Sequence, residues 1–512
     1  MTRTHPATPA VDATRASDNG QHAVVIGGGF GGIAAALRLR ARGYAVTLVE
    51  RLERLGGRAQ VYERDGFRFD AGPTVITAPW LFDELFALFG RERADAVAFL
   101  PVSPWYRIGF ADGSHLDYGP DRAHTEAEIQ RIAPGELNGY RAFAAHARAF
   151  HDVAFERLGA QPFHKLTTLL RYGPQLLRLQ AFRSVYGLAS RYMRDERLRQ
   201  AFSLQPLLIG GNPKATTAIY SLIHELEHRD GVLFPKGGTG ALVDALDNLL
   251  RDVGVGIITG QTVERIDTDG GRVTGVTLTD GVTLPACLVV SDADPAYVHR
   301  HMLPGVRRRR WTNQRLGRLR YAMGLYVLYF GTDCRYEGVP HHTIQMGPDY
   351  HRELDGIFHR GEIATKPSLY LHRPTATDPD IAPSGRDSFY VLAAVPNLAA
   401  GIDWAHAGPR LRDAVLDRLE ASVLPGLREH LVTAFDVTPV DFGRDYLASH
   451  GSAFSIQPLF TQSAWFRFHN RSEEVAGLHF VGAGTHPGAG VPGVITSAKA
   501  MAASLDDEGG EA

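Results

Sequence analysis

The sequence contains little cysteine and no excess of charge of either sign. Cys287 and Cys334 are the only cysteines in 512 residues, and neither stands in a CxxC pair, so we expect neither a disulfide scaffold nor a metal site. His341 and His342 are adjacent but lack a matching second pair of ligands. With 54 Lys and Arg against 56 Asp and Glu, the chain has no basic field, and nucleic acid is not an expected partner.

Long apolar runs are also missing. No stretch of about eighteen apolar residues occurs, so we expect no membrane-spanning helix, and any membrane contact must be peripheral. Residues 1–20 are polar and rich in Ala and Thr, without the apolar core of a signal peptide, and are predicted to form a disordered tail. The low cysteine content fits a reducing cytoplasm, and the length predicts two or more domains.

Glycines, in contrast, are concentrated after the first strand-like segment. Residues 23–26 are apolar like a buried strand, and residues 33–39 have the Ala-rich composition of a helix. Gly27, Gly29 and Gly32 lie between them at GxGxxG spacing. In a dinucleotide-binding unit the first glycine makes the tight turn, the second lets the backbone approach a pyrophosphate, and the third lets the helix pack on the strand.

The residues that follow favour FAD over NAD. Glu50 ends the second predicted strand, where an acid accepts a hydrogen bond from a ribose hydroxyl. Gly56, Gly57 and Arg58 come next, and in flavoproteins of the glutathione-reductase type this stretch returns to the cofactor. The alternative for Arg58 is an ordinary surface arginine.

A second glycine cluster, VGAGTHPGAGVPGV (481–494), precedes a helix-forming run near the C-terminus. Such a cluster lets backbone N–H groups approach an anion, although a tight loop before a terminal helix has the same composition. Residues 253–294 show period-2 alternation and DG or GG turns, which predict a β-meander that feeds back into the nucleotide domain.

A basic stretch without acidic residues runs from Lys165 to Arg194. It is helical in texture, with breaks expected at Gly173-Pro174 and near Gly187. Leucines and aromatics fill the gaps between the cations, as in helices that lie on an anionic membrane surface, and Leu176 and Leu177 are expected to insert. The alternative is a helical subdomain with a solvated basic face.

Nearly the whole chain, from about residue 23 to residue 504, resembles the carotenoid desaturases of the bacterial phytoene desaturase type. The resemblance lies in FDAGPTVIT (69–77), LQAFRSVYGLASRYMRDERLRQAFSLQPLLIGGNP (179–213), FPKGGTGALV (234–243), HGSAFSIQPLFTQSAWFRFHNR (450–471) and the C-terminal glycine cluster. These motifs are long and specific, whereas the first glycine motif alone would indicate only the broader flavin amine oxidase superfamily.

The resemblance implies an α/β fold. It comprises a doubly wound, Rossmann-like FAD-binding domain (21–95 with 221–300 and 472–505). Residues 96–220 with 301–471 would form a mixed-sheet substrate domain with a helical membrane-facing region. The cofactor-binding residues are then expected to be Gly27, Gly29, Gly32, Glu50, Gly56, Gly57, Arg58, Val263, Gly482, Gly484, Gly493 and Val494. The N-terminal and C-terminal glycines would hold one FAD from opposite ends of the chain.

The implied reaction is the desaturation of phytoene and other acyclic carotenoids, most simply through four steps to lycopene. The flavin takes the hydride and passes electrons to oxygen or a quinone. Trp465, Phe466 and Phe468 could stabilise positive charge on the polyene, but core packing explains them equally well. His486 is a weak candidate for the base, and a structural role in the loop is the preferred interpretation.

Three alternatives remain open from the sequence. Two keep the fold as an enzyme: a desaturase of hydroxylated carotenoids, or a carotenoid cis–trans isomerase. The third is a non-catalytic prenyl-lipid binder of the same fold, like the Rab GDP-dissociation inhibitors. The complete set of Gly27, Gly29, Gly32 and Glu50 argues against this last one.

Overall fold

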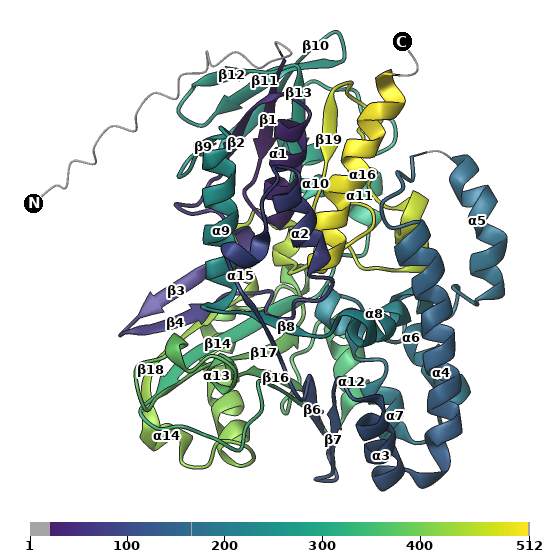
Figure 1. Cartoon of the computed structure of the whole chain (residues 1–512), viewed down its shortest axis with the longest axis vertical. Coiled ribbons are helices and arrows are strands. Elements are labelled where there is room, and N and C mark those ends of the chain that lie inside the picture. The colour runs from purple at the N-terminus through teal and green to yellow at the C-terminus, as the bar shows by residue number, and fades with distance from the viewer. Residues whose placement is uncertain (1–20, 165, 510–512) are drawn as a thin grey trace, which may run out of the picture.

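The computed structural model describes residues 21–164 and 166–509 (Figure 1). The tail predicted for residues 1–20 and the cation Lys165 lie outside the described residues.

A five-stranded parallel sheet forms one half of the molecule. Its order is β19 (Leu478–Phe480), β13 (Leu288–Ser291), β1 (His22–Ile26), β2 (Ala45–Val49) and β9 (Gly256–Ile258). The strands β1 and β13 are almost entirely buried, as expected for parallel strands that are covered on both faces. Helices α1 (Phe30–Ala41), α2 (Trp80–Ala87), α9 (Gly238–Asp252) and α16 (Val491–Gly509) pack together on one face of this sheet, with α1 and α16 side by side (Figure 1). The other face packs on strands from residues 263–278. The predicted α/β class with a parallel sheet is confirmed, but the sheet is not doubly wound, because an antiparallel β-sheet rather than helices packs on its second face.

The predicted meander is also present. Strands β10 (Val263–Asp269), β11 (Arg272–Leu278) and β12 (Thr283–Pro285) form an antiparallel sheet, and the chain then enters β13 beside β1. The parallel sheet therefore takes strands from three separate segments of the sequence, each within the predicted FAD-binding domain. The domain boundaries themselves stay a prediction.

A seven-stranded mixed sheet forms the other half. Its order is β18 (Leu431–Val437), β14 (Gly324–Thr332), β17 (Asp387–Val395), β16 (Leu369–His372), β15 (His342–Gln345), β6 (Tyr106–Gly109) and β7 (His115–Tyr118). Helix α13 (Trp404–Glu420) packs on one face through Leu411, Val415 and Leu419. The ribbons β3 (Val61–Arg64) with β4 (Phe67–Asp70), and β5 (Phe99–Pro101) with β8 (Leu233–Pro235), lie between the two large sheets (Figure 1).

Helices gather at one side of the mixed sheet (Figure 1). They are α3 (Arg122–Ile132), α4 (Leu137–Phe150), α5 (Leu166–Arg178), α6 (Val185–Tyr192), α7 (Glu196–Ala201), α8 (Leu222–Asp230) and α12 (Tyr350–Asp355). Shorter helices elsewhere are α10 (Pro295–Tyr297), α11 (Asn313–Arg318), α14 (Leu427–His430) and α15 (Pro439–Asp445).

The helix break expected at Gly173-Pro174 is wrong, whereas a break near Gly187 is present, because α5 ends at Arg178 and α6 begins at Val185. Pro174 lies inside α5, and Gly187 lies inside α6. A proline removes the hydrogen bond to the carbonyl four residues earlier, here Leu170, but this residue is two-thirds exposed, so water can replace that bond. The chain breaks instead between the helices, where Gln180 adopts a φ of +59° and Ser184 caps α6.

Candidate active site

The first glycine motif forms the turn between β1 and α1 and faces a cavity of about 470 Å³. Gly27 has a φ of +96°, which L side chains rarely adopt, and it lines this cavity together with Gly29. A Cβ atom on Gly32 would collide with the carbonyl oxygen of Gly27. Glycine at this third position therefore lets α1 pack closely on the turn, as the motif predicts.

Glu50 follows β2 and holds the glycine turn in place. Its Oε2 accepts a hydrogen bond from the N–H of Gly28 at 2.6 Å, and its Oε1 accepts one from the N–H of Leu52 at 2.9 Å. Burial raises the pKa of this carboxyl, and the two backbone N–H groups oppose the rise. Glu50 lines the cavity, but its predicted contact with a ribose stays a prediction.

The stretch after Glu50 returns to the glycine motif. Gly56 donates its N–H to the carbonyl of Gly28 at 2.8 Å, and Gly56 and Gly57 have φ values of +116° and +55°. The guanidinium of Arg58 lies 5.6 Å from the centre of the Tyr446 ring. Its buried Nε has no hydrogen-bond partner within the described part of the chain. A buried, unpaired donor on the cavity wall fits a ligand that carries acceptor atoms.

The C-terminal glycine cluster closes the cavity from the other end of the chain. Gly493 and Val494 line the cavity in the first turn of α16, which begins at Val491. A Cβ atom on Gly484 would overlap Pro295, and Gly482 donates its N–H to Ser497 Oγ at 2.8 Å, so these two glycines serve the packing of the loop. Val263, at the start of β10, also lines the cavity.

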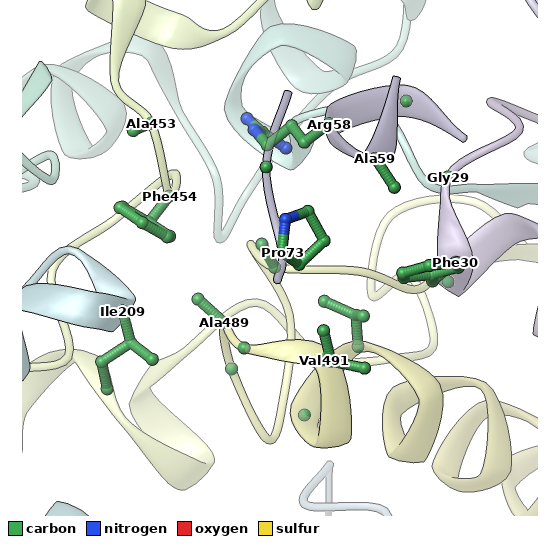
Figure 2. A pocket seen from close by; sticks show the side chains of 18 of the residues that line it. Gly29, Phe30, Arg58, Ala59, Pro73, Ile209, Ala453, Phe454, Ala489 and Val491 are labelled. Carbon is green, nitrogen blue, oxygen red and sulfur yellow. The ribbon is translucent and has the colours of Figure 1, made fainter. Parts of the chain in front are cut away.

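Figure 2 shows this arrangement from close by. Gly29 and Phe30 lie on one side of the pocket, Phe454 and Ile209 lie on the other, and Pro73 projects between them. Segments from the start, the middle and the end of the sequence therefore share one enclosed space.

Asp292 is a cavity residue that the sequence reasoning missed. It follows β13, and a Cβ atom placed on Gly29 or Gly31 would come within 2.5 Å of its carboxylate oxygens. Burial raises the pKa of Asp292 to about 7, while the N–H groups of Gly32 and Gly29 and the charge of Arg58 oppose the rise. Its place at the carboxyl end of a parallel strand, where ligands bind in open α/β sheets, was the available signal.

Hydroxyl groups line the cavity where the loop after β4 meets the mixed sheet. Thr74 Oγ1 lies 2.7 Å from Tyr390 Oη and 3.5 Å from Tyr370 Oη. Tyr370 Oη in turn lies 2.7 Å from Nδ1 of the buried His342. The adjacent pair His341 and His342 does have a third neighbour, because the pairing of β15 with β16 places His372 opposite His342. The sequence did not indicate this cluster, since strand pairing over thirty residues creates it.

The weak base candidate His486 lines the cavity and is buried. Its ring lies 4.7 Å from that of Phe163, and burial lowers its pKa to about 3. An imidazole in this setting is neutral at pH 7 and a poor proton acceptor. The aromatic candidate Phe468 packs on Trp311 with ring centres 4.1 Å apart, in the core rather than on the cavity wall.

Comparisons with known proteins agree with this geometry. The family model described as flavin containing amine oxidoreductase matches residues 30–505. A lycopene-forming phytoene desaturase from Pseudescherichia vulneris is 48% identical over 487 residues, which cover 95% of this chain and 99% of that protein. A neurosporene-forming phytoene desaturase from Rhodobacter capsulatus is 44% identical over 491 residues, which cover 95% and 94%.

Solved structures share the fold at low sequence identity. An oxidoreductase from Methanosarcina mazei has a TM-score of 0.63 at 18% identity and covers 95% of this chain and all of its own. Cyclohexylamine oxidase from Brevibacterium oxydans has a TM-score of 0.62 at 18% identity and covers 95% and 99%.

Proposed function

Because the chain belongs to the bacterial phytoene desaturases of the flavin-containing amine oxidoreductase family, we propose that it desaturates phytoene with bound FAD, through four steps to lycopene. The main support for this proposal is the 48% identity to a lycopene-forming phytoene desaturase over nearly the full length of both chains. The cavity is consistent with this role, since it joins a glycine-lined end to a largely apolar wall.

FAD is the cofactor we assign to the glycine-lined end. Gly27, Gly29, Glu50 and Arg58 would hold its adenosine and pyrophosphate parts, and the first turn of α16 would cover it, with Gly493 and Val494 on the cavity wall. The unpaired Nε of Arg58 supports this assignment, because a buried donor without a partner costs free energy unless a ligand satisfies it. Bound FAD supplies the hydride acceptor for the reaction.

The remaining wall of the cavity suits a hydrocarbon. Its apolar residues include Leu176, Leu207, Leu208, Ile219, Leu222 and Ile223 from the helical region. These side chains exclude water and bind a long substrate without polar contacts, so orientation depends on the shape of the cavity. The hydroxyl groups of Thr74, Tyr370 and Tyr390 are the polar exception on the sheet side.

Helix α5 is the segment we assign to the membrane surface. Leu170 and Leu177 stand seven residues apart on one face, with exposed fractions of 67% and 54%, and Phe182 is 56% exposed. Leu176 was expected to insert together with Leu177, but it is buried and lines the cavity instead. Helix α5 therefore contacts the cavity on one face and is exposed on the other. This is a suitable position for the entry of a lipid-soluble substrate.

Among the described residues, no helix is long and apolar enough to cross a membrane. We assign the protein to the cytoplasmic face of a membrane as a peripheral protein. Oxygen or a quinone is the proposed final electron acceptor.

The deciding experiment incubates the protein with phytoene in liposomes and FAD, followed by chromatography of the pigments. We expect phytoene to be consumed and lycopene to accumulate, and Gly29→Val, which puts a side chain where the pyrophosphate belongs, serves as the inactive control. A colourless protein that cannot be reconstituted with FAD would instead support a non-catalytic lipid binder. Conversion confined to hydroxylated carotenoids, or a change of double-bond geometry alone, would support one of the other two alternatives.

A further inference from the structure

Each desaturation releases one proton inside a cavity whose wall is largely apolar. The inference in this section rests on the desaturase function proposed above. We propose that Glu227 is the proton acceptor of the desaturation, held at the cavity wall by the phenol hydroxyls of Tyr106 and Tyr118.

Glu227 projects from α8 into the space between the helical region and the mixed sheet. It lines the cavity and is only 1% exposed. Its Oε1 accepts a hydrogen bond from Tyr106 Oη at 3.0 Å, and its Oε2 accepts one from Tyr118 Oη at 3.2 Å. Tyr118 Oη also lies 2.9 Å from Nδ1 of His224, so a polar path leads away from the carboxylate.

A second buried glutamate on the same helix shows what is unusual about Glu227. Glu225 is 3% exposed and forms ion pairs with Arg122, Arg148 and Arg229. Among the described residues, none of the ion pairs involves Glu227. A buried carboxyl without a cation destabilises a fold unless it has another role, because desolvation of its charge is not repaid.

The groups around Glu227 are held neutral near pH 7, so it is the group that can change charge there. Burial raises the pKa of Tyr106, Tyr118 and Tyr140 and lowers the pKa of His224 and His228. Beyond Tyr106, on the sheet side, stand Tyr370, Tyr390 and His342, which burial holds neutral in the same way. Burial also raises the pKa of Glu227 to about 7, and the two phenol hydroxyls oppose the rise.

Other acidic residues on the cavity wall are already engaged. Glu50 holds Gly28 and Leu52, Asp294 caps α10, and Asp445 is paired with Arg444. Asp292 lies against the glycine motif, at the end of the cavity assigned to the cofactor. Glu227 is the carboxyl that the helical region presents on the wall where we expect the hydrocarbon.

Each desaturation breaks two C–H bonds and forms one C=C bond. One allylic C–H bond of the substrate breaks, and its hydrogen leaves with both electrons to bound FAD. The C–H bond on the neighbouring carbon breaks, its electron pair becomes the new C=C bond, and its proton goes to a carboxylate oxygen of Glu227. The protonated Glu227 then releases its proton to solvent before the next step, and Tyr118 and His224 are the first polar groups beyond it.

The main test compares wild type with Glu227→Gln, which keeps the shape and removes the charge. In anaerobic single turnovers with phytoene in liposomes, the wild-type rate of flavin reduction should rise with pH through about 7. In the Gln variant it should fall by about a hundredfold or more and lose this pH dependence. The matched control Glu225→Gln, which breaks three ion pairs on the same helix, should keep the wild-type pH profile even if its melting temperature falls.

A readout without cofactor or substrate separates chemistry from folding. In the apoprotein, the infrared difference spectrum between wild type and Glu227→Gln should contain a protonated-carboxyl band that titrates near pH 7, whereas the band of Asp292, which both proteins share, cancels. Glu225→Gln should keep the Glu227 band. If Glu227→Gln fails to fold, Tyr106→Phe takes its place. Loss of one donor to the carboxylate should raise the pKa of Glu227, so the rate profile should shift to higher pH.

Two results would overturn the inference while leaving the desaturase function intact. One is a Gln variant, loaded with FAD, that reduces its flavin within about twofold of wild type at every pH. The other is an unshifted profile in Tyr106→Phe together with an infrared difference spectrum between wild type and Glu227→Gln that contains no band titrating near pH 7. A wild type that does not consume phytoene would contradict the proposed function itself.

Discussion

Asp292 stands directly against Gly29, so close that a Cβ atom on the glycine would lie 2.5 Å from the Asp292 Oδ2 atom. This contact places a carboxyl with a pKa of about 7 where the glycine motif predicts a pyrophosphate. A negative ligand binds best while Asp292 is protonated, and repulsion grows once the carboxyl loses its proton.

The affinity for FAD should therefore be constant below about pH 6 and fall by up to tenfold per pH unit above about pH 7. In Asp292→Asn the affinity should change little over the same range. Titration of apoprotein with FAD, followed by quenching of flavin fluorescence from pH 5.5 to 9, measures both curves. Asp280→Asn, in an exposed turn, is the control, and equal slopes in wild type and Asp292→Asn would contradict this prediction.

Glu50 should be a main determinant of FAD affinity. Its carboxylate holds the glycine turn through Gly28 and is the predicted partner of the ribose, and hydrogen bonds to charged groups contribute about 1.5–3 kcal/mol. Glu50→Ala should therefore weaken FAD binding by roughly ten- to a hundredfold. Isothermal titration of the folded apoprotein measures this loss, and Glu53→Gln, on the exposed side of the same loop, should bind like wild type. Unchanged affinity in folded Glu50→Ala would exclude the ribose contact.

The half that contains the parallel sheet was predicted well, because the sequence patterns that indicate it are local. The spacing of Gly27, Gly29 and Gly32 indicates a turn that side chains would block. The alternation of apolar and polar residues with period 2 indicates the meander. The position of Asp292 depends on which strands pair across more than 260 residues, so local patterns carry no record of it.

The half that contains the mixed sheet was harder to predict for the same reason. Glu227 and Tyr106 are more than a hundred residues apart and meet only after α8 packs on the mixed sheet. Pro174 was misinterpreted as a break because local propensity ignores the solvent that satisfies the freed carbonyl. Leu176 and Leu177 are neighbours in sequence, yet helical geometry points them about 100° apart, one to the cavity and one outward.

Membrane association should depend on the exposed apolar residues of α5 and the following turn more than on charge. If three arginines face the surface at about 1 kcal/mol each, electrostatics contributes only about 3 kcal/mol, and apolar side chains must add to it. Leu177→Ser combined with Phe182→Ser should release the protein from anionic liposomes more effectively than high salt does. Flotation assays measure this, with Val282→Ser as an equally exposed control on another part of the surface. Complete release of wild type by salt alone would contradict the insertion of these side chains.

The final prediction concerns the order in which products appear. One flavin beside one cavity oxidises only the carbons near it, so a symmetric substrate must leave and return reversed, or be rebound from the membrane, before its second half can react. Partly desaturated intermediates should therefore appear early and decline with time, and a high ratio of phytoene to enzyme should enrich them, because each released intermediate competes with fresh phytoene. Time courses at several ratios, analysed by chromatography, test this. Relatives with both lycopene-forming and neurosporene-forming names match the chain, so the end point is decisive. A stable end point at neurosporene or ζ-carotene with excess enzyme would contradict four steps while leaving the desaturase function in place.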